Sequence, residues 1–107
     1  MAKAKDKKLI LQSIERYIEE LRKRNIDVVT AYLYGSHAQG KATEWSDIDV
    51  AVLTNKFIGD RFDFTFLLMK IAREVDFNIE PHPFLAEEFT EDDPLAGEVI
   101  RTGEKVA

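Results

Sequence analysis

The sequence has 107 residues, of which 45% are hydrophobic and 33% are charged, and none is cysteine. This length and balance are typical of a single globular domain, taken here as residues 1–107, and exclude a fibrous or disordered chain. The absence of cysteine excludes a disulfide scaffold, a cysteine-ligated zinc site and a thiol nucleophile.

The formal net charge is −5, and the charges are unevenly placed. Residues 1–25 mix basic side chains with glutamates, whereas residues 74–100 carry acids and neither Lys nor Arg. Because duplex binding needs a concentrated cationic surface, we expect no direct nucleic-acid partner. No apolar run reaches the roughly 18 residues of a membrane helix, so we expect no membrane segment and a cytoplasmic location.

The N-terminal half is predicted to contain one helix and two strands. Residues 5–24 have apolar side chains at helical spacing and are predicted to form an amphipathic helix. Residues 28–34 are rich in β-branched and aromatic side chains, which predicts a buried strand ending at a Gly-Ser turn. Residues 37–46 are expected to form a short helical turn and a loop, and residues 48–53 a second strand.

The C-terminal half is predicted to add a helix, a strand and a helix. Apolar spacing predicts a helix from Asp63 onward, and apolar and polar residues then alternate over 75–82, as in a half-exposed strand. Pro81 and Pro83 place the end of that strand at a sheet edge. The acidic segment before Pro94 predicts a helix reaching Arg101. The element order indicates an α/β or α+β fold, with helices packed on one face of a small mixed sheet.

One motif lies at the junction of the first two predicted strands. It is Gly35-Ser36-x3-Gly40-x5-Ser46-Asp47-x-Asp49. A glycine at position 35 lets the backbone turn sharply and approach a ligand closely. Ser36 begins a helical turn, where free N–H groups and a hydroxyl can converge on phosphate oxygens. This half of the motif therefore indicates phosphate binding.

The second half of the motif supplies carboxylates. Asp47 and Asp49 lie two residues apart at a strand, so both are expected on one face. Carboxylate oxygens opposite phosphates suit Mg²⁺, and two such ions could hold the attacking and leaving oxygens of an in-line displacement. A third acid is expected, either Glu80 or Asp76 of the third strand, although Asp76 could instead cap the preceding helix. Glu80 could also serve as a general base toward an acceptor hydroxyl.

The motif resembles that of the nucleotidyltransferase superfamily related to DNA polymerase β, and specifically its minimal nucleotidyltransferase (MNT) members. The resemblance implies a nucleotidyltransferase fold, with Gly35 and Ser36 holding the triphosphate of ATP. It implies two Mg²⁺ ions on Asp47, Asp49 and Glu80, and transfer of a nucleoside monophosphate to a hydroxyl. His37 and Gln39 stand where many relatives have arginine, so His37 and Lys41 are the expected additional phosphate contacts.

The resemblance also implies a biological setting. Small MNT proteins are similar to the antitoxin half of modules whose other half is an all-helical HEPN toxin, in some cases adding AMP to a tyrosine of that toxin. A protein adenylyltransferase of this kind is the function we expect, and self-association is a further option. The alternatives are an antitoxin that acts by binding alone, an enzyme acting on a small-molecule hydroxyl such as an aminoglycoside, and a nucleotide-binding module.

Other side chains have simpler explanations. His82, between two prolines, is expected to be structural, and Trp45 to anchor the loop or to stack on a base. The aromatic residues of 57–66 are expected mostly in the core, and any that is exposed would indicate a partner surface. The acidic residues of 87–93 are expected to form a solvated face or to bind a basic partner.

Overall fold

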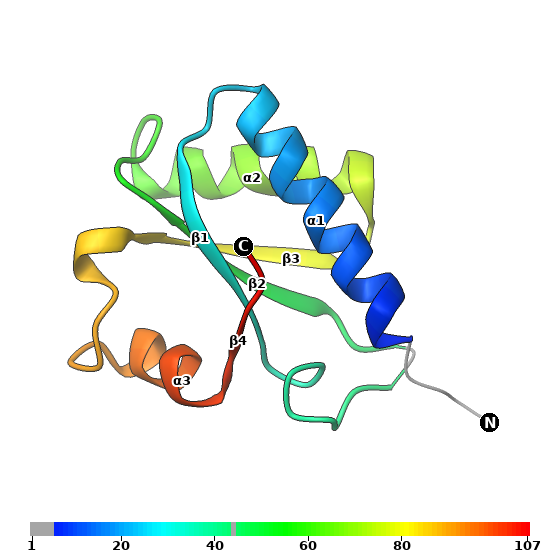
Figure 1. The fold of residues 1–107 in the computed structure, drawn as a ribbon. Helices are drawn as coiled ribbons and strands as arrows, with labels where there is room; N and C mark the ends of the chain where they lie inside the picture. The colour runs from blue at the N-terminus through cyan, green and yellow to red at the C-terminus, as the bar shows by residue number, and fades with distance from the viewer. Residues whose placement is uncertain (1–5, 44) are drawn as a thin grey trace.

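A four-stranded sheet with strand order β3-β2-β1-β4 forms the centre of the fold in the computed structural model, which describes residues 6–43 and 45–107 (Figure 1). β1 pairs antiparallel with β2 and with β4, and β2 pairs parallel with β3, so the predicted mixed sheet is confirmed. The elements are α1 (Lys7–Lys23), β1 (Val28–Tyr34), β2 (Ile48–Thr54), α2 (Arg61–Val75), β3 (Ile79–Leu85), a 3-10 turn η1 (Ala86–Glu88), α3 (Pro94–Thr102) and β4 (Glu104–Lys105).

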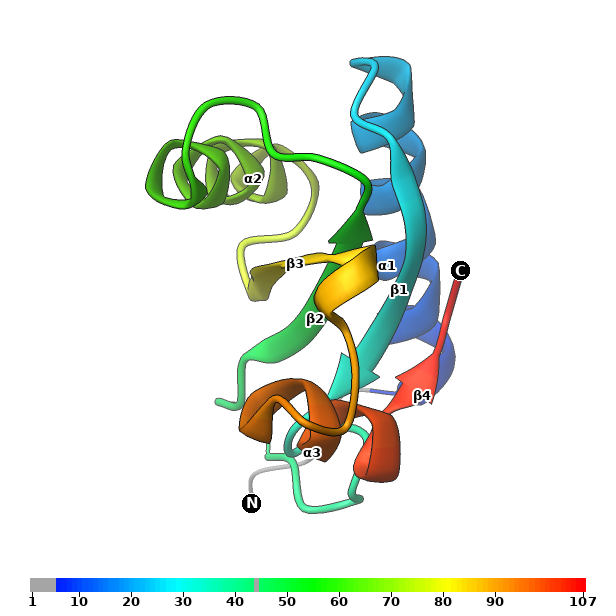
Figure 2. The same cartoon turned by 90° about the vertical axis from the view of Figure 1, so that its left-hand side faces the viewer.

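α1 and α2 cover one face of the sheet (Figure 2). Their buried side chains form one core with the alternate strand residues Ile48, Val50 and Val52. The hydroxyl of Tyr17 in α1 donates a 2.8 Å hydrogen bond to the Leu68 carbonyl oxygen in α2, which joins the two helices inside this core. No helix in the described part of the chain is long and apolar enough to cross a membrane.

α3 packs on the opposite face. Ala51 and Leu53 point away from the main core because side chains alternate along a strand, and they form a second cluster with Ala96 and Val99 of α3. The Asp93 carboxylate accepts from the N–H groups at the start of α3, as the predicted cap requires. The expected fold class is confirmed. The expectation that the helices all pack on one face of the sheet holds for α1 and α2, whereas α3 packs on the opposite face.

The third strand begins later than its alternating pattern predicts. α2 continues to Val75, and Asp76 ends it, so β3 begins at Ile79. β3 then runs through Pro81 and Pro83, which is tolerated because an edge strand has N–H groups that need no partner strand. Two further elements, η1 and the two-residue β4, are too short for a periodic pattern to predict.

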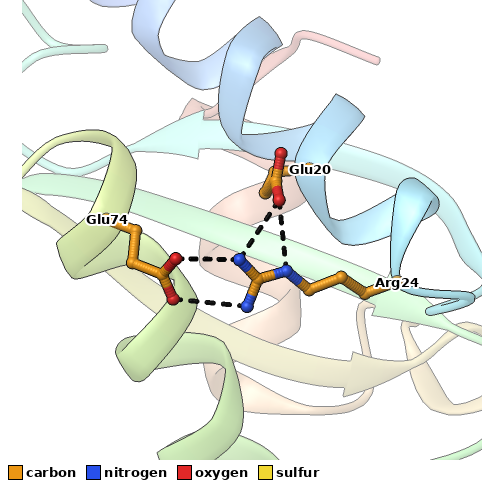
Figure 3. A network of polar contacts seen from close by, with 3 residues as sticks. All are labelled: Glu20, Arg24 and Glu74. Atoms are coloured by element: carbon orange, nitrogen blue, oxygen red, sulfur yellow. Dashed lines mark hydrogen bonds and ion pairs between the residues drawn. The ribbon is translucent and has the colours of Figure 1, made fainter.

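A charged network connects α2 to the end of α1 (Figure 3). The Arg24 guanidinium donates to both Glu74 oxygens, at 2.9 and 3.3 Å, and to Glu20 at 3.2 Å. The hydrogen bond from Arg24 lowers the pKa of Glu74, and the attraction between the two charges lowers it further. Glu74 and Arg24 are exposed and Glu20 is partly exposed, so water screens the network and it contributes only modestly to stability.

Candidate active site

The Gly-Ser turn directly follows β1 and is closed by its own backbone. Gly35 and Gly40 both have positive φ values, 73° and 71°. The N–H of Gln39 donates to the Gly35 carbonyl at 3.1 Å, and the N–H of Lys41 donates to the Ser36 carbonyl at 3.0 Å. The predicted helical turn is therefore present, with Ser36 half-buried and Lys41 exposed.

Gly35 lies directly against an acid of the motif. Tyr34 pairs with Asp49 across β1 and β2, which brings the next residue, Gly35, beside the Asp49 side chain. A Cβ at position 35 would lie 2.4 Å from Asp49 Oδ2, far inside van der Waals contact. Glycine is thus required both by the positive φ and by the carboxylate, and the two halves of the motif form one site.

Asp49 and Glu80 lie side by side on neighbouring strands. The parallel register of β2 and β3 pairs Asp49 with Glu80, so both belong to the sheet face that α3 partly covers. Both side chains are half-buried, whereas Asp47 is exposed just before β2. Within residues 6–43 and 45–107, no group of three His, Asp or Glu side chains is arranged so that it could hold a metal ion.

Asp76 belongs to the connection between α2 and β3. Its N–H donates to the Ala72 carbonyl, and its carboxylate accepts from the N–H of Asn78 at 2.9 Å. It therefore has the capping role that was the alternative to metal binding. Of the two candidate third acids, Glu80 is the one whose register places it beside Asp49.

His37 supports the loop from inside. Its side chain is only 6% exposed, and Nε2 lies 3.4 Å from the Ser46 carbonyl oxygen. This contact joins the Gly-Ser turn to the segment that leads into Asp47. A role in holding the two halves of the motif together follows from this position, and phosphate contact by His37 remains a prediction.

His82 and Tyr34 also lie at the site, although the sequence patterns did not assign them to it. His82 Nε2 is 3.4 Å from Asp49 Oδ1, and the His82 ring packs edge-on against Tyr34, with centroids 5.5 Å apart. His82 is two residues after Glu80 in the same strand, so the period-2 rule applied to β3 could have found it. Tyr34 is the last residue of β1 and directly precedes Gly35, so its place in the sequence could have shown that it lies beside the turn.

Burial and nearby acids disfavour ionisation of the Tyr34 hydroxyl. Burial raises the pKa of Tyr34, and the negative charges of Asp49, Glu98 and Glu80 raise it further. Glu98 belongs to α3, so acids from two strands and one helix act on this phenol. The direction of the shift indicates that the phenol lies in a buried, negatively charged environment beside the candidate site.

Trp45 lies just before the acids of the motif and is exposed to solvent. Trp45 is 82% exposed, so it is not buried as an anchor within the described chain, and its ring is open to a base or a partner.

Asp47, Asp49 and Glu80 supply only hard carboxylate oxygens, which are the ligands that Mg²⁺ prefers. Asp49 and Glu80 are strand neighbours beside the Gly-Ser turn, so the kind of donor fits Mg²⁺, while the described side chains do not form a three-ligand metal site.

Comparison with known proteins agrees with this geometry. The family described as "Polymerase beta, Nucleotidyltransferase" matches residues 16–106. A curated protein of Methanocaldococcus jannaschii, named "Putative protein adenylyltransferase MJ1305", is 27% identical over 85 residues. That stretch is 77% of this chain and 58% of the relative, so the chain spans little more than half of the relative's length.

Solved structures share the fold. A toxin-antitoxin crystallised with AMP-PNP is 24% identical, with a TM-score of 0.66 over 91% of this chain and 72% of that chain. A mutant of the toxin-antitoxin MntA-HpeT is 27% identical, with a TM-score of 0.60 over 85% of this chain and 68% of that chain. The family match takes in the Gly-Ser turn and all three candidate acids. The chain belongs to the polymerase beta nucleotidyltransferase family.

Proposed function

We propose that this chain transfers a nucleoside monophosphate, AMP from ATP, to a hydroxyl group of a partner protein, and that it acts as an antitoxin. The observation that carries the proposal is the packing of Gly35 against Asp49, with Glu80 paired beside it. This arrangement places the Gly-Ser turn against two neighbouring carboxylates, Asp49 and Glu80 (the acid row), in a chain of the polymerase beta family, which supports phosphate and metal binding here.

Each part of the site has a role in the proposed transfer. The Ser36 hydroxyl and the free N–H groups of the turn would bind the triphosphate oxygens. Asp47, Asp49 and Glu80 would hold two Mg²⁺ ions, which neutralise phosphate charge when bound. In the reaction, the acceptor oxygen bonds to the α-phosphorus, the bond to pyrophosphate breaks, and a carboxylate of the acid row accepts the hydroxyl proton. His82 and Tyr34 would fix the orientation of Asp49.

The acceptor is proposed to be a tyrosine of an all-helical HEPN-type toxin. Two solved structures with the same fold are named as toxin-antitoxins, one of them with AMP-PNP, which supports a toxin partner and an ATP substrate. The described elements build the sheet and the candidate site, and we propose that the partner supplies the acceptor hydroxyl. Residues 87–93 are acidic and mostly exposed, which suits a basic, RNA-binding protein.

The direct test uses ATP labelled on the α-phosphate, Mg²⁺ and a helical HEPN-type protein as the proposed partner. We expect the label on a tyrosine of that protein, located by mass spectrometry, with release of pyrophosphate. The Asp47→Asn/Asp49→Asn variant should leave the partner unlabelled while it keeps the wild-type thermal midpoint. Label transfer by that variant would contradict the site assignment.

Three further measurements separate the alternatives. If the chain neutralises its partner by binding alone, the Asp47→Asn/Asp49→Asn variant should still neutralise that partner in cells. An enzyme for small molecules would label an aminoglycoside with no second protein present. A nucleotide-binding module would bind ATP and release no pyrophosphate.

A further inference from the structure

The outer face of α2 carries exposed aromatic side chains. Phe62, Phe66 and Phe77 are 78%, 67% and 75% exposed, in contrast to the prediction that the aromatics of 57–66 lie mostly in the core. Phe64 is fully buried, so the opposite faces of the same helix have different roles. Figure 2 shows no other described element on the outer side of α2. Contiguous exposed apolar surface of this kind indicates an interaction site.

The centre of this face is shaped to receive a side chain from another helix. A shallow, almost wholly apolar groove is lined by Phe66, Met69, Lys70 and Arg73. These residues stand at positions i, i+3, i+4 and i+7 of the helix, which is the four-residue hole that accepts a knob in helix–helix packing. Phe62 lies on α2 one turn before Phe66, and Phe77 lies in the turn that follows α2, where Arg73 packs over its ring; both are exposed rings that can act as knobs at the ends of the groove. We call these six residues the α2 stripe.

We propose that the α2 stripe binds the α2 stripe of a second copy of this chain, with the two helices antiparallel. The stripe is symmetric about the midpoint between Met69 and Lys70. A two-fold axis at that point places Phe62 against Phe77, Phe66 against Arg73, and Met69 against Lys70 of the other copy. Because both the holes and the knobs belong to one surface, the surface is complementary to itself, as a two-fold dimer interface requires.

Charge supports the antiparallel arrangement. The stripe's cations, Lys70 and Arg73, lie in the C-terminal half of α2, and Asp63 lies in the N-terminal half. The antiparallel pairing brings the cations of one copy toward Asp63 and the aromatic rings of the other. Arg73 already packs over the Phe77 ring, at 4.8 Å from its centroid, which keeps the guanidinium on the stripe. A parallel pairing would instead place cations opposite cations.

The area is also sufficient for a dimer. Three phenylalanines exposed to this degree contribute roughly 400 Å² on each copy. The two copies together, with the stems of Met69, Lys70 and Arg73, reach the roughly 1,200 Å² at which specific interfaces begin. The acid row lies on the other face of the sheet, with α3, so the dimer leaves the candidate active site open.

Cross-linking tests the geometry, and the chain is suited to it because it contains no cysteine. Met69→Cys should be linked to its own copy by a short bis-maleimide, because position 69 lies beside the two-fold axis. Phe62→Cys alone should not be linked, since the two copies of that residue lie about 22 Å apart along the helix. A mixture of Phe62→Cys and Phe77→Cys chains should be linked. Leu9→Cys, which is exposed on α1, is the matched control and should give no cross-link.

Analytical ultracentrifugation tests the association itself. We expect the unmodified chain to sediment at twice its 12.3 kDa mass. Phe66→Glu should weaken the dimer by about 30-fold or more, while Leu9→Glu keeps it and both keep the wild-type circular dichroism. A monomer at all concentrations, a dimer unaffected by Phe66→Glu, or self-linking of Phe62→Cys would overturn the proposal. A monomer that instead forms a complex with a helical partner, lost in Phe66→Glu, would assign the stripe to that partner and would also overturn it.

Discussion

The space that a side chain would need at Gly35 is filled by the carboxylate of Asp49, since a Cβ there would lie 2.4 Å from Asp49 Oδ2. This contact holds the Gly-Ser turn directly against the Asp49 carboxylate. Displacement of the turn by even a methyl group would move Ser36 and Asp49 apart. The steric fit of these two residues is therefore the basis of the proposed site.

Replacement of Gly35 by alanine tests this contact. We expect Gly35→Ala to lower nucleotide transfer by at least about 100-fold, because displaced reacting groups lose that much rate. The variant should also lose roughly 1–2 kcal/mol of unfolding free energy, because alanine is strained at positive φ. Transfer assays and urea denaturation measure the two effects.

Gly40→Ala is the matched control for Gly35→Ala. Gly40 has nearly the same φ, but a Cβ there has no described atom within 4 Å. Gly40→Ala should lose a similar unfolding free energy but keep most of its nucleotide transfer, measured by the same two assays. Equal losses of transfer in the two variants would show that backbone strain, not the Asp49 carboxylate, accounts for the Gly35 requirement.

His82 provides a second test of how Asp49 is oriented. His82→Ala should weaken the apparent affinity for Mg²⁺ by about 10- to 100-fold, as is usual for groups that orient metal ligands. His82→Gln keeps a donor near Asp49 Oδ1 and should recover much of that loss. A magnesium titration of nucleotide binding measures this. Identical titrations for His82→Ala and the wild type would limit His82 to a packing role.

Tyr17→Phe tests the junction of α1 and α2. The change removes the buried 2.8 Å hydrogen bond to the Leu68 carbonyl, so the unfolding free energy should fall by about 1 kcal/mol. In a domain of this size the thermal midpoint should fall by about 4–8 °C. Tyr32→Phe, whose hydroxyl has no described hydrogen bond, is the control and should change the midpoint little.

The Arg24–Glu74 pair should make stability depend on pH. The pKa of Glu74 is lower in the folded chain than its ordinary value of 4.5, chiefly because of the hydrogen bond from Arg24. The stabilisation is therefore complete above pH 4.5 and is lost as the pH falls through the folded-state pKa. Glu74→Gln should lower the thermal midpoint slightly at pH 7 and not in strong acid. Glu19→Gln, which lacks a described ion pair, should cause no such pH-dependent difference.

Local sequence patterns predicted most of the fold. β1 has the predicted bounds, and α1 and α2 agree with the expected helices within about two residues, because their apolar spacing repeats over several turns. The start of β3 was wrong because the alternation from Val75 to Asn78 coincides with the end of a helix and a turn. β4 forms only because the chain returns to pair with Leu33, a long-range contact that no local pattern contains.

The candidate site was predictable only in part. The spacing of Gly35, Ser36, Asp47 and Asp49 identified the motif, and strand alternation pointed to Glu80. The partnership of His82 with Asp49 depends on the register of two strands that are separated by a helix. The α2 stripe could not be predicted either, because phenylalanine is usually a core residue. The exposure of Phe62 and Phe66 depends on which face of α2 packs against the sheet.

The central claim is that Asp47 and Asp49, held beside the Gly-Ser turn, carry nucleotidyl transfer. Its most direct measurement is pyrophosphate release from ATP and Mg²⁺ in the presence of the helical partner, compared between the wild type and Asp47→Asn/Asp49→Asn. We expect steady release by the wild type and only background release by the folded double variant. Equal release by both proteins would contradict it.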